Sequence, residues 1–292
     1  MAPQRGHVRP RSLVLYVYGA FVRRVGGWIA FRDLARLMED LRVEPSTVRA
    51  VLGRMRERGL VAPDRRAGVP GYALTPTAWA ILDAGDRRIT AAREPAALAD
   101  GWVLVVFTIP ESRRDARHRI RGALTWLGFG TVAPGVWIAP RRLRAEGLAA
   151  LGGLEHEGYV ELFDVDAGEL DHTRRLVARC WDLAALEGMY TRFVERWEPA
   201  LRRSVDGRRA FVDSVHAIAD WRKLPFLDPG LPPEVLPEGW VGQRAAWVYF
   251  TLLGRLDAAA LAHVRATASS LDTAPSPHHH DDRQADGRTG EV

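Results

Sequence analysis

The segment from Glu44 to Arg66, "EPSTVRAVLGRMRERGLVAPDRR", combines a helix-start signal, a narrow apolar stripe and six arginines. Pro45 suits the first turn of a helix, and the side chain of Glu44 or Ser46 can accept hydrogen bonds from the exposed backbone amides there. At about 100° per residue, the apolar side chains fall on one side of the helix. These side chains are Val48, Val51, Leu52 and Met55.

The opposite side of this predicted helix carries hydroxyls, small residues and arginines: Ser46, Thr47, Arg49, Ala50, Gly53 and Arg54. Small residues let a helix axis approach a surface closely, and hydroxyls at the positive end of the helix dipole can bond phosphates or base edges. Arginines reach guanine edges or phosphates in the major groove. We therefore predict a DNA-recognition helix, with Arg65 and Arg66 of the following hairpin on the DNA backbone. The alternative is an ordinary surface helix.

The elements around this helix follow a recognisable order in residues 10–92. We expect a helix at about Ser12–Arg24, a second helix in "FRDLARLMEDL" and a third that starts near Pro45. Short strands at Leu60–Ala62 and Tyr72–Leu74 then flank a turn rich in Gly, Pro and Asp. Three helices followed by a hairpin are typical of a winged helix-turn-helix domain, which binds DNA through its third helix.

The rest of the chain divides into two further domains and a tail, so the predicted fold class is α+β. Residues 98–168 alternate apolar and amphipathic segments in the order β-α-β-β-α-β, which indicates a ferredoxin-like middle domain. Residues 169–270 are mainly helical, with a long helix or a broken pair around Cys180 and a proline-rich connection after Lys223. Residues 271–292 are polar and are predicted to be a disordered tail.

Charge is distributed unevenly along the 292 residues. Residues 1–90 hold sixteen arginines and eight acids, a balance of +8, whereas the whole chain carries +5, so that residues 91–292 sum to −3. A basic N-terminal part is expected of a domain that meets a polyanion. Because arginine is abundant throughout, with Lys223 as the sole lysine, a solvated arginine-rich surface is the alternative interpretation.

The early apolar run from Leu13 to Val22 resembles a secretory signal, but Arg23 and Arg24 follow it at once. We expect a first core helix there, no membrane segment and a cytoplasmic protein. The one cysteine, Cys180, fits a reducing compartment.

Sequence patterns for catalysis are weak, and we predict neither an enzyme nor a metal or cofactor site. A phosphate-binding P-loop needs a lysine after its glycines, and Lys223 has no such loop. Cys180 lies among apolar residues, as a buried core thiol does. His278, His279 and His280 fall in the predicted tail, where no fixed geometry for a metal is expected.

Several long segments in order resemble the PaaX-type transcriptional repressors of phenylacetic acid degradation. They are "SLVLYVYGAF", "EPSTVRAVLGRMRERGLV", "GYALTPTAW", "GWVLVVFTIPESRRDARHRIRGALTWLGFGTVAPGVWIAP" and "AIADWRKLPFLDPGLPPEVLPEGWVG". The resemblance implies a homodimeric repressor that binds a double-stranded operator. It also implies release from the operator by an aryl-CoA thioester such as phenylacetyl-CoA.

The middle domain also resembles the CRISPR spacer-acquisition endoribonuclease fold, whose activity uses an aspartate at the end of the first strand. This chain has Thr108, Ile109 and Pro110 there, so we expect dimerisation or a relay role instead. A metal-dependent nuclease built on this domain and a CoA-ester-handling enzyme are the alternative functions.

The helical domain supplies candidates for an effector pocket, since aromatic rings can enclose an aryl group and an arginine can hold a phosphate. The candidate residues are Tyr190, Trp197, Trp221, Arg222 and Trp240. The alternative is that these aromatic residues form an ordinary helical core.

Overall fold

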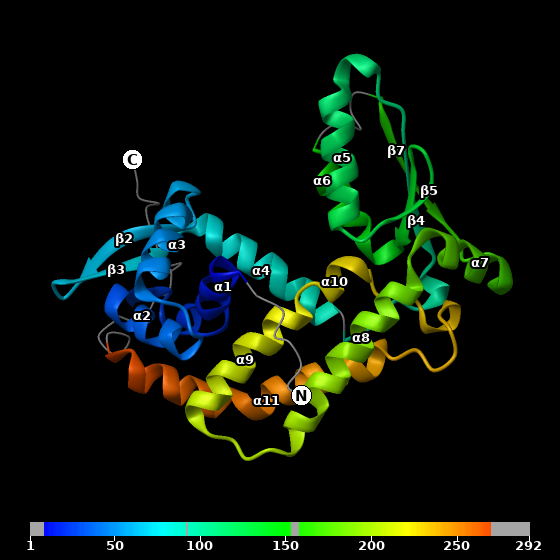
Figure 1. The fold of residues 1–292 in the computed structure, drawn as a ribbon. Helices are drawn as coiled ribbons and strands as arrows, with labels where there is room; N and C mark the ends of the chain where they lie inside the picture. Colours follow the sequence, from blue (N-terminus) through cyan, green and yellow to red (C-terminus); the bar gives the residue numbers. More distant parts are fainter. Residues whose placement is uncertain (1–8, 92, 153–157, 270–292) are drawn as a thin grey trace, which may run out of the picture. The chain divides into compact units, whose positions relative to one another are not determined.

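The computed structural model describes residues 9–91, 93–152 and 158–269 (Figure 1). The chain separates into two compact units. The N-terminal unit holds residues 9–78 together with the described residues from His263 onward, and the C-terminal unit holds Trp79–Ala262. Helices and two antiparallel sheets make up these units, which confirms the predicted α+β class.

The N-terminal unit contains three helices and a three-stranded sheet of order β1-β3-β2. Its elements are α1 (Pro10–Ala20), β1 (Trp28–Ala30), α2 (Phe31–Asp40), α3 (Pro45–Glu57), β2 (Val61–Arg66) and β3 (Val69–Leu74). The predicted element order is present, and the third helix starts at Pro45 as predicted. The strands of the hairpin extend closer to the turn than predicted, with Arg66 paired with Val69 in the register.

The predicted first helix, Ser12–Arg24, was wrong at both ends. The helix starts two residues earlier because Pro10 occupies its first turn. It ends at Ala20, and a 3-10 turn, η1 (Val22–Val25), leads to Gly26, whose φ of 97° is a left-handed conformation that stops a helix. The side chains of Leu13, Val17 and other apolar residues of α1 are buried, as expected of a core helix.

The last described residues of the chain belong to the N-terminal unit. His263 Nε2 lies 2.7 Å from Oδ2 of Asp40, at the end of α2, and Val264 and Ala268 are fully buried. The predicted disordered tail, residues 271–292 with its three histidines, lies outside the described residues.

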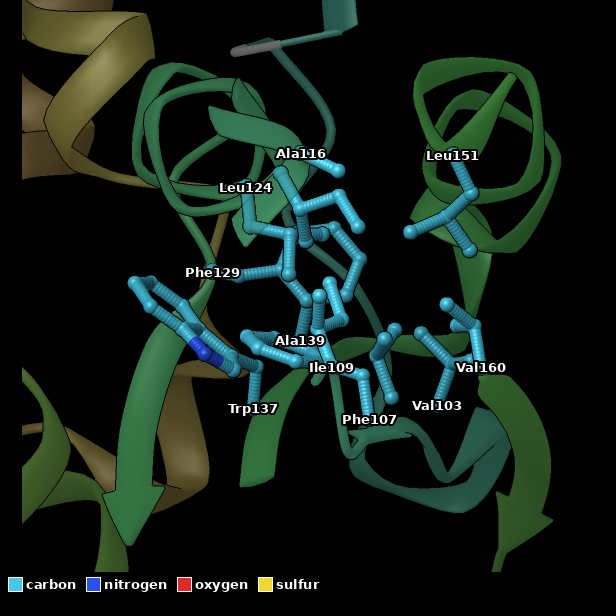
Figure 2. Close-up of a cluster of buried hydrophobic side chains, with 12 residues drawn as sticks. Val103, Phe107, Ile109, Ala116, Leu124, Phe129, Trp137, Ala139, Leu151 and Val160 are labelled. Carbon is cyan, nitrogen blue, oxygen red and sulfur yellow. The ribbon is translucent and has the colours of Figure 1, made fainter. Parts of the chain in front are cut away.

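The C-terminal unit contains a four-stranded antiparallel sheet of order β5-β6-β4-β7. Its elements, in the predicted β-α-β-β-α-β order, are β4 (Trp102–Phe107), α5 (Arg114–Trp126), β5 (Gly130–Ala133), β6 (Val136–Pro140), α6 (Arg144–Leu151) and β7 (Val160–Val165). Helices α5 and α6 bury apolar side chains against one face of this sheet. Figure 2 shows this cluster, in which Leu124 and Leu151 lie over Val103, Phe129 and Val160.

The other face of the sheet also packs on the helical part of the unit. Trp102 and Ile138 form a cluster with Val177 and Trp181, whose indole Nε1 donates a 3.0 Å hydrogen bond to the carbonyl of Gly128. Strand β4 is therefore covered on both faces of the sheet, which explains why all six of its residues are apolar.

The remaining helices are α4 (Pro76–Ala91), α7 (Leu170–Cys180), α8 (Leu183–Trp197), α9 (Gly207–Trp221), α10 (Leu224–Leu227) and α11 (Gly242–Thr267). They belong to the C-terminal unit, except for the first residues of α4 and the last residues of α11, which belong to the N-terminal unit. Short 3-10 turns lie at Leu98–Asp100, Glu111–Arg113, Arg141–Leu143, Glu198–Arg202 and Pro233–Val235. The long helical segment is a broken pair, because Asp182 caps the start of α8 by accepting from the amide of Ala185. Helix α9 has no counterpart among the elements predicted from the sequence.

Helix α11 is long and apolar enough to cross a membrane by length and composition alone. It is an exception to the expectation that the chain has no such segment. Several of its side chains, including Tyr249 and Leu252, are buried against the protein. A core helix passes the same test, so this helix is weak evidence for a membrane span.

Gly71 of β3 lies against the backbone of the paired strand β1 and the ring of Trp28, which gives a test of the N-terminal unit. A Cβ at this position would lie 2.5 Å from the Ile29 carbonyl oxygen and 2.7 Å from the ring of Trp28. Gly71→Ala is expected to lower the free energy of unfolding by about 1–3 kcal/mol, measured by urea denaturation. The matched control is Gly53→Ala, where a Cβ meets no atom within 4 Å. Equal stability of the two variants would contradict the close approach.

Candidate nucleic-acid interface

Helix α3 is held by its apolar stripe. Val48, Val51, Leu52 and Met55 are each at most 1 % exposed, and the helix packs against α1 and α2. This confirms the predicted inner face of the helix. Because the stripe is continuous and narrow, it also determines which residues face outward.

The predicted DNA-contacting residues of α3 lie on that outward face. Ser46, Arg49, Ala50 and Arg54 are exposed, and Thr47 and Gly53 are half-buried. An added Cβ at Gly53 would meet nothing within 4 Å, so the packing of the unit does not require a glycine there. On the outer face of α3, the small residues Ala50 and Gly53 therefore lie between Arg49 and Arg54. Another molecule can approach the helix backbone closely at these small residues.

The predicted side-chain cap at the start of α3 was wrong. Glu44 is the N-cap residue by backbone conformation, but no side-chain capping hydrogen bond is present. Its carbonyl accepts from the Val48 amide at 3.1 Å. Pro45 has no amide hydrogen, which removes one donor that a cap would otherwise satisfy. The first turn of α3 therefore presents backbone amides, at the positive end of the helix dipole, without a side-chain oxygen over them.

Arginines gather at the other end of α3. Burial lowers the pKa of Arg11, and the nearby Arg58 and Arg54 lower this pKa further. The three guanidinium groups therefore repel one another, and a polyanion at this position would relieve that repulsion.

Arg49 is positioned by an aromatic ring of the same unit. Its guanidinium lies 4.9 Å from the ring centroid of Phe31, the first residue of α2. This cation–π contact limits the directions in which the exposed side chain can point.

The two arginines of the hairpin differ in their surroundings. Arg66 forms an ion pair with Asp64 at 3.0 Å and lies over the ring of Trp28 at 5.2 Å, so its charge is partly engaged within the unit. Arg65 is exposed and donates a 2.7 Å hydrogen bond to the carbonyl of Gly68, in the turn of the hairpin. Of the two, Arg65 is the better placed to meet a neighbouring phosphate.

Three of the five effector candidates come together around one cavity, which we call the aromatic cavity. It has a volume of about 520 Å³ and is lined by Tyr190, Trp221, Trp240, Arg93 and Trp247, among others. The Tyr190 hydroxyl donates a 2.8 Å hydrogen bond to Asp228 Oδ2. Burial raises the pKa of Tyr190 well above its ordinary value, and the negative charge of Asp228 raises it further.

Trp221 has features of both a helical core residue and a residue of an effector pocket, the two alternatives that the sequence left open. Its ring stacks on Tyr249 with centroids 4.7 Å apart and an interplanar angle of 10°, which is typical of a helical core. Its indole Nε1 is buried and has no hydrogen-bond partner in the described part of the chain. The Trp221 side chain is thus a core residue that also faces the aromatic cavity.

The other two effector candidates lie elsewhere. Trp197 donates a 2.9 Å hydrogen bond to Asp220 and does not line the aromatic cavity. Arg222 lines a second cavity, of about 470 Å³, which we call the arginine cavity. Arg88 and Arg142 also line this cavity and are not among the site residues predicted from the sequence. The pattern of the sequence gives no signal for them, because each belongs to a different element.

Other candidate groups show little capacity for catalysis. Cys180 is half-buried at the end of α7, rather than fully buried as predicted, and burial raises the pKa of its thiol. A raised pKa makes a thiolate nucleophile less available. Among the residues that the structure describes, no group of three or more His, Cys, Asp or Glu side chains is arranged to hold a metal ion.

Comparisons with known families cover most of the chain. Residues 9–78 match the model of the PaaX-like protein, residues 95–177 that of the PaaX protein central Cas2-like domain, and residues 181–266 that of the PaaX-like protein C-terminal domain. The chain belongs to the PaaX-like protein family.

Two similar proteins cover nearly the full length. The chain is 28% identical over 281 residues to the transcriptional repressor PaaX of Escherichia coli (strain K12), across 91% of this chain and 86% of the relative. A solved structure, the uncharacterized protein Rv0674 from Mycobacterium tuberculosis, aligns with a TM-score of 0.60 and 21% identity. It covers 88% of this chain and 98% of its own, and shows a shared fold.

The hydrogen bond in the aromatic cavity gives a test of its geometry. Tyr190→Phe leaves the Asp228 carboxylate without one donor and is expected to lower the free energy of unfolding by about 1–3 kcal/mol, measured by urea denaturation. Tyr249→Phe is the matched control, because this buried tyrosine has no hydroxyl hydrogen bond among the described residues. A loss no larger than that of the control would contradict the hydrogen bond.

Proposed function

We propose that this chain is a DNA-binding transcriptional repressor of an aromatic-compound catabolic operon of the phenylacetate type. The observation that carries the proposal is the exposed face of α3, where Ser46, Arg49 and Arg54 flank small residues while the apolar stripe is fully buried. The full-length similarity to a protein named as a transcriptional repressor supports it. The chain is accordingly a regulator and not an enzyme, and it acts in the cytoplasm.

In this proposal residues 10–92 form a winged helix-turn-helix domain. Helix α3 lies in the major groove, where the side chains of its N-terminal part meet base edges. The first-turn amides and Thr47 meet phosphates, as helix N-termini commonly do. Arg65 contacts the backbone beside the groove, and Arg66 supports it from its ion pair with Asp64.

We further propose that residues 98–168 form a ferredoxin-like domain for dimerisation or relay. The strand order β5-β6-β4-β7, with two helices on one face, supports this topology. A homodimer would place two α3 helices in successive major grooves, about 34–36 Å apart, on a partly palindromic operator.

The effector in this proposal is an aryl-CoA thioester such as phenylacetyl-CoA, bound by the helical domain of residues 169–270. Tyr190, Trp221 and Trp240 offer aromatic walls for the aryl group in the aromatic cavity. Trp197 does not contact the effector in this proposal; it is a buried residue of the helical core that bonds Asp220. Arg222, which lines the arginine cavity instead, is not part of the aryl site. No cofactor takes part.

The alternative function as a metal-dependent nuclease has no support at the end of strand β4. Strand β4 ends at Phe107, and the residues that follow are Thr108, Ile109 and Pro110, of which Ile109 is buried. None of them can supply the carboxylate that the nuclease function would need at this point.

The proposal is tested by the α3 variants in a DNA-binding titration with the chain's own upstream region at fixed salt. Arg49→Ala or Arg54→Ala is expected to weaken specific binding by about 1–3 kcal/mol if the side chain bonds a base. Arg175→Ala, an exposed arginine of α7, is the matched control and is expected to bind like the parent.

Gly53→Ala tests whether DNA approaches the α3 backbone closely, because it adds a methyl group without changing the charge of the helix. It is measured in the same titration. Alanine is favoured over glycine inside a helix by about 0.5–1 kcal/mol, so this variant is expected to be more stable yet to bind operator more weakly. If all three α3 variants bind like the Arg175→Ala control, α3 is not the recognition helix.

A further inference from the structure

The arginine cavity lies within the C-terminal unit, apart from the interface on α3, and four separate segments build its walls. Helix α4 supplies Ile81 and Arg88, the end of α5 supplies Trp126, the segment before α6 supplies Arg142, and the segment after α9 supplies Phe226. Its walls therefore combine guanidinium groups with large apolar surfaces.

Arg88 brings a cation with an unsatisfied hydrogen-bond donor to this cavity. Its Nε donates a 2.8 Å hydrogen bond to the carbonyl of Pro225, and its guanidinium lies 4.5 Å from the ring centroid of Phe226. The Nη2 atom is buried and has no hydrogen-bond partner in the described residues. Burial lowers the pKa of Arg88 to about 10, so the group remains a cation at neutral pH. A buried donor without a partner is costly, and costlier when it is charged.

The neighbours of Arg88 do not balance this charge fully. The negative charge of Glu146 raises the pKa of Arg88 and so stabilises the cation, whereas the positive charge of Arg142 lowers this pKa. Arg142 itself donates to backbone carbonyls of Pro229 and Glu94, and burial lowers its pKa. The other carboxylate of the cavity, Asp228, accepts from Tyr190 and from the amides of the turn that follows.

Two glycines lie against the guanidinium groups of this cavity. A Cβ at Gly128 would stand 3.4 Å from Arg88 Nη2, and one at Gly85 would stand 3.6 Å from Arg222 Nη2. A side chain at either position would therefore contact these nitrogens.

The apolar wall of the cavity is unusually exposed for large side chains. Trp126 is 61% exposed although it stacks on Phe226 with centroids 4.0 Å apart, and Ile81 is 45% exposed. Covering apolar surface of this size is favourable in proportion to the area removed from water.

We propose that the arginine cavity binds a small amphipathic anion. Its carboxylate or phosphate group accepts hydrogen bonds from Arg88 Nη2 beside Arg142, and its apolar body covers Trp126 and Ile81. This site is distinct from the aromatic cavity, and the proposal stands whether or not the chain binds DNA.

The test uses the full chain and the fluorescent probe 8-anilinonaphthalene-1-sulfonate, which joins an anionic group to an aromatic body. Arg88→Gln is expected to weaken probe binding at least tenfold in a calorimetric titration, because the charge that recognises the sulfonate is lost. The matched control is Arg121→Gln, which removes an exposed guanidinium of α5 that lines neither cavity. This control is expected to bind the probe at the arginine cavity like the parent.

Competition identifies the anion. Displacement of the probe from the parent by inorganic phosphate indicates a phosphate ligand, and displacement by benzoate indicates a carboxylate with an aromatic body. Failure of both to displace the probe overturns the proposal, and so does equal probe affinity of the parent and Arg88→Gln.

A thermal melt without ligand shows whether Arg88→Gln folds. If it does not, a second variant tests the proposal. Trp126→Ala changes an exposed side chain and is expected to fold. This variant should bind the probe severalfold more weakly than the parent. Phosphate should still displace the probe that remains bound. Unchanged probe affinity in this variant would overturn the proposal. Failure of the α3 variants to affect DNA binding would leave these results untouched.

Discussion

The burial of one narrow stripe on α3 determines the arrangement of the N-terminal unit. Val48, Val51, Leu52 and Met55 are almost completely removed from water, and each such side chain contributes about 1.5–3 kcal/mol when fully buried. A rotation of the helix about its axis would expose part of this stripe. The stripe therefore fixes Arg49, Gly53 and Arg54 on the outside, and the DNA-binding role that we propose depends on that orientation.

The parts of this unit that the sequence predicted are those governed by periodicity and by strong local signals. The inner face of α3 follows from apolar spacing, and its start follows from Pro45. The missing side-chain cap and the engagement of Arg66 with Asp64 and Trp28 were not predictable in this way. They depend on side-chain rotamers and on strand register, which a pattern of residue types does not specify.

In the C-terminal unit the order of strands and helices could be predicted, but the composition of its cavities could not. Tyr190, Trp221 and Trp240 surround one cavity, whereas Trp197, of the same residue type, is used to bond Asp220. The arginine cavity was missed altogether, because its residues come from elements far apart in the sequence and only the tertiary fold brings them together. Nothing in the sequence distinguishes Arg88 from the many other arginines, because the unsatisfied donor of its guanidinium is a consequence of burial in the fold.

The central claim is that the outward face of α3 meets DNA. The most direct measurement is arginine footprinting with phenylglyoxal, read by mass spectrometry, on the full chain with and without DNA from its own upstream region. We expect DNA to protect Arg49 and Arg54 from modification while Arg175 in α7 reacts equally in both samples. Equal modification of Arg49 and Arg54 with and without bound DNA would contradict the account.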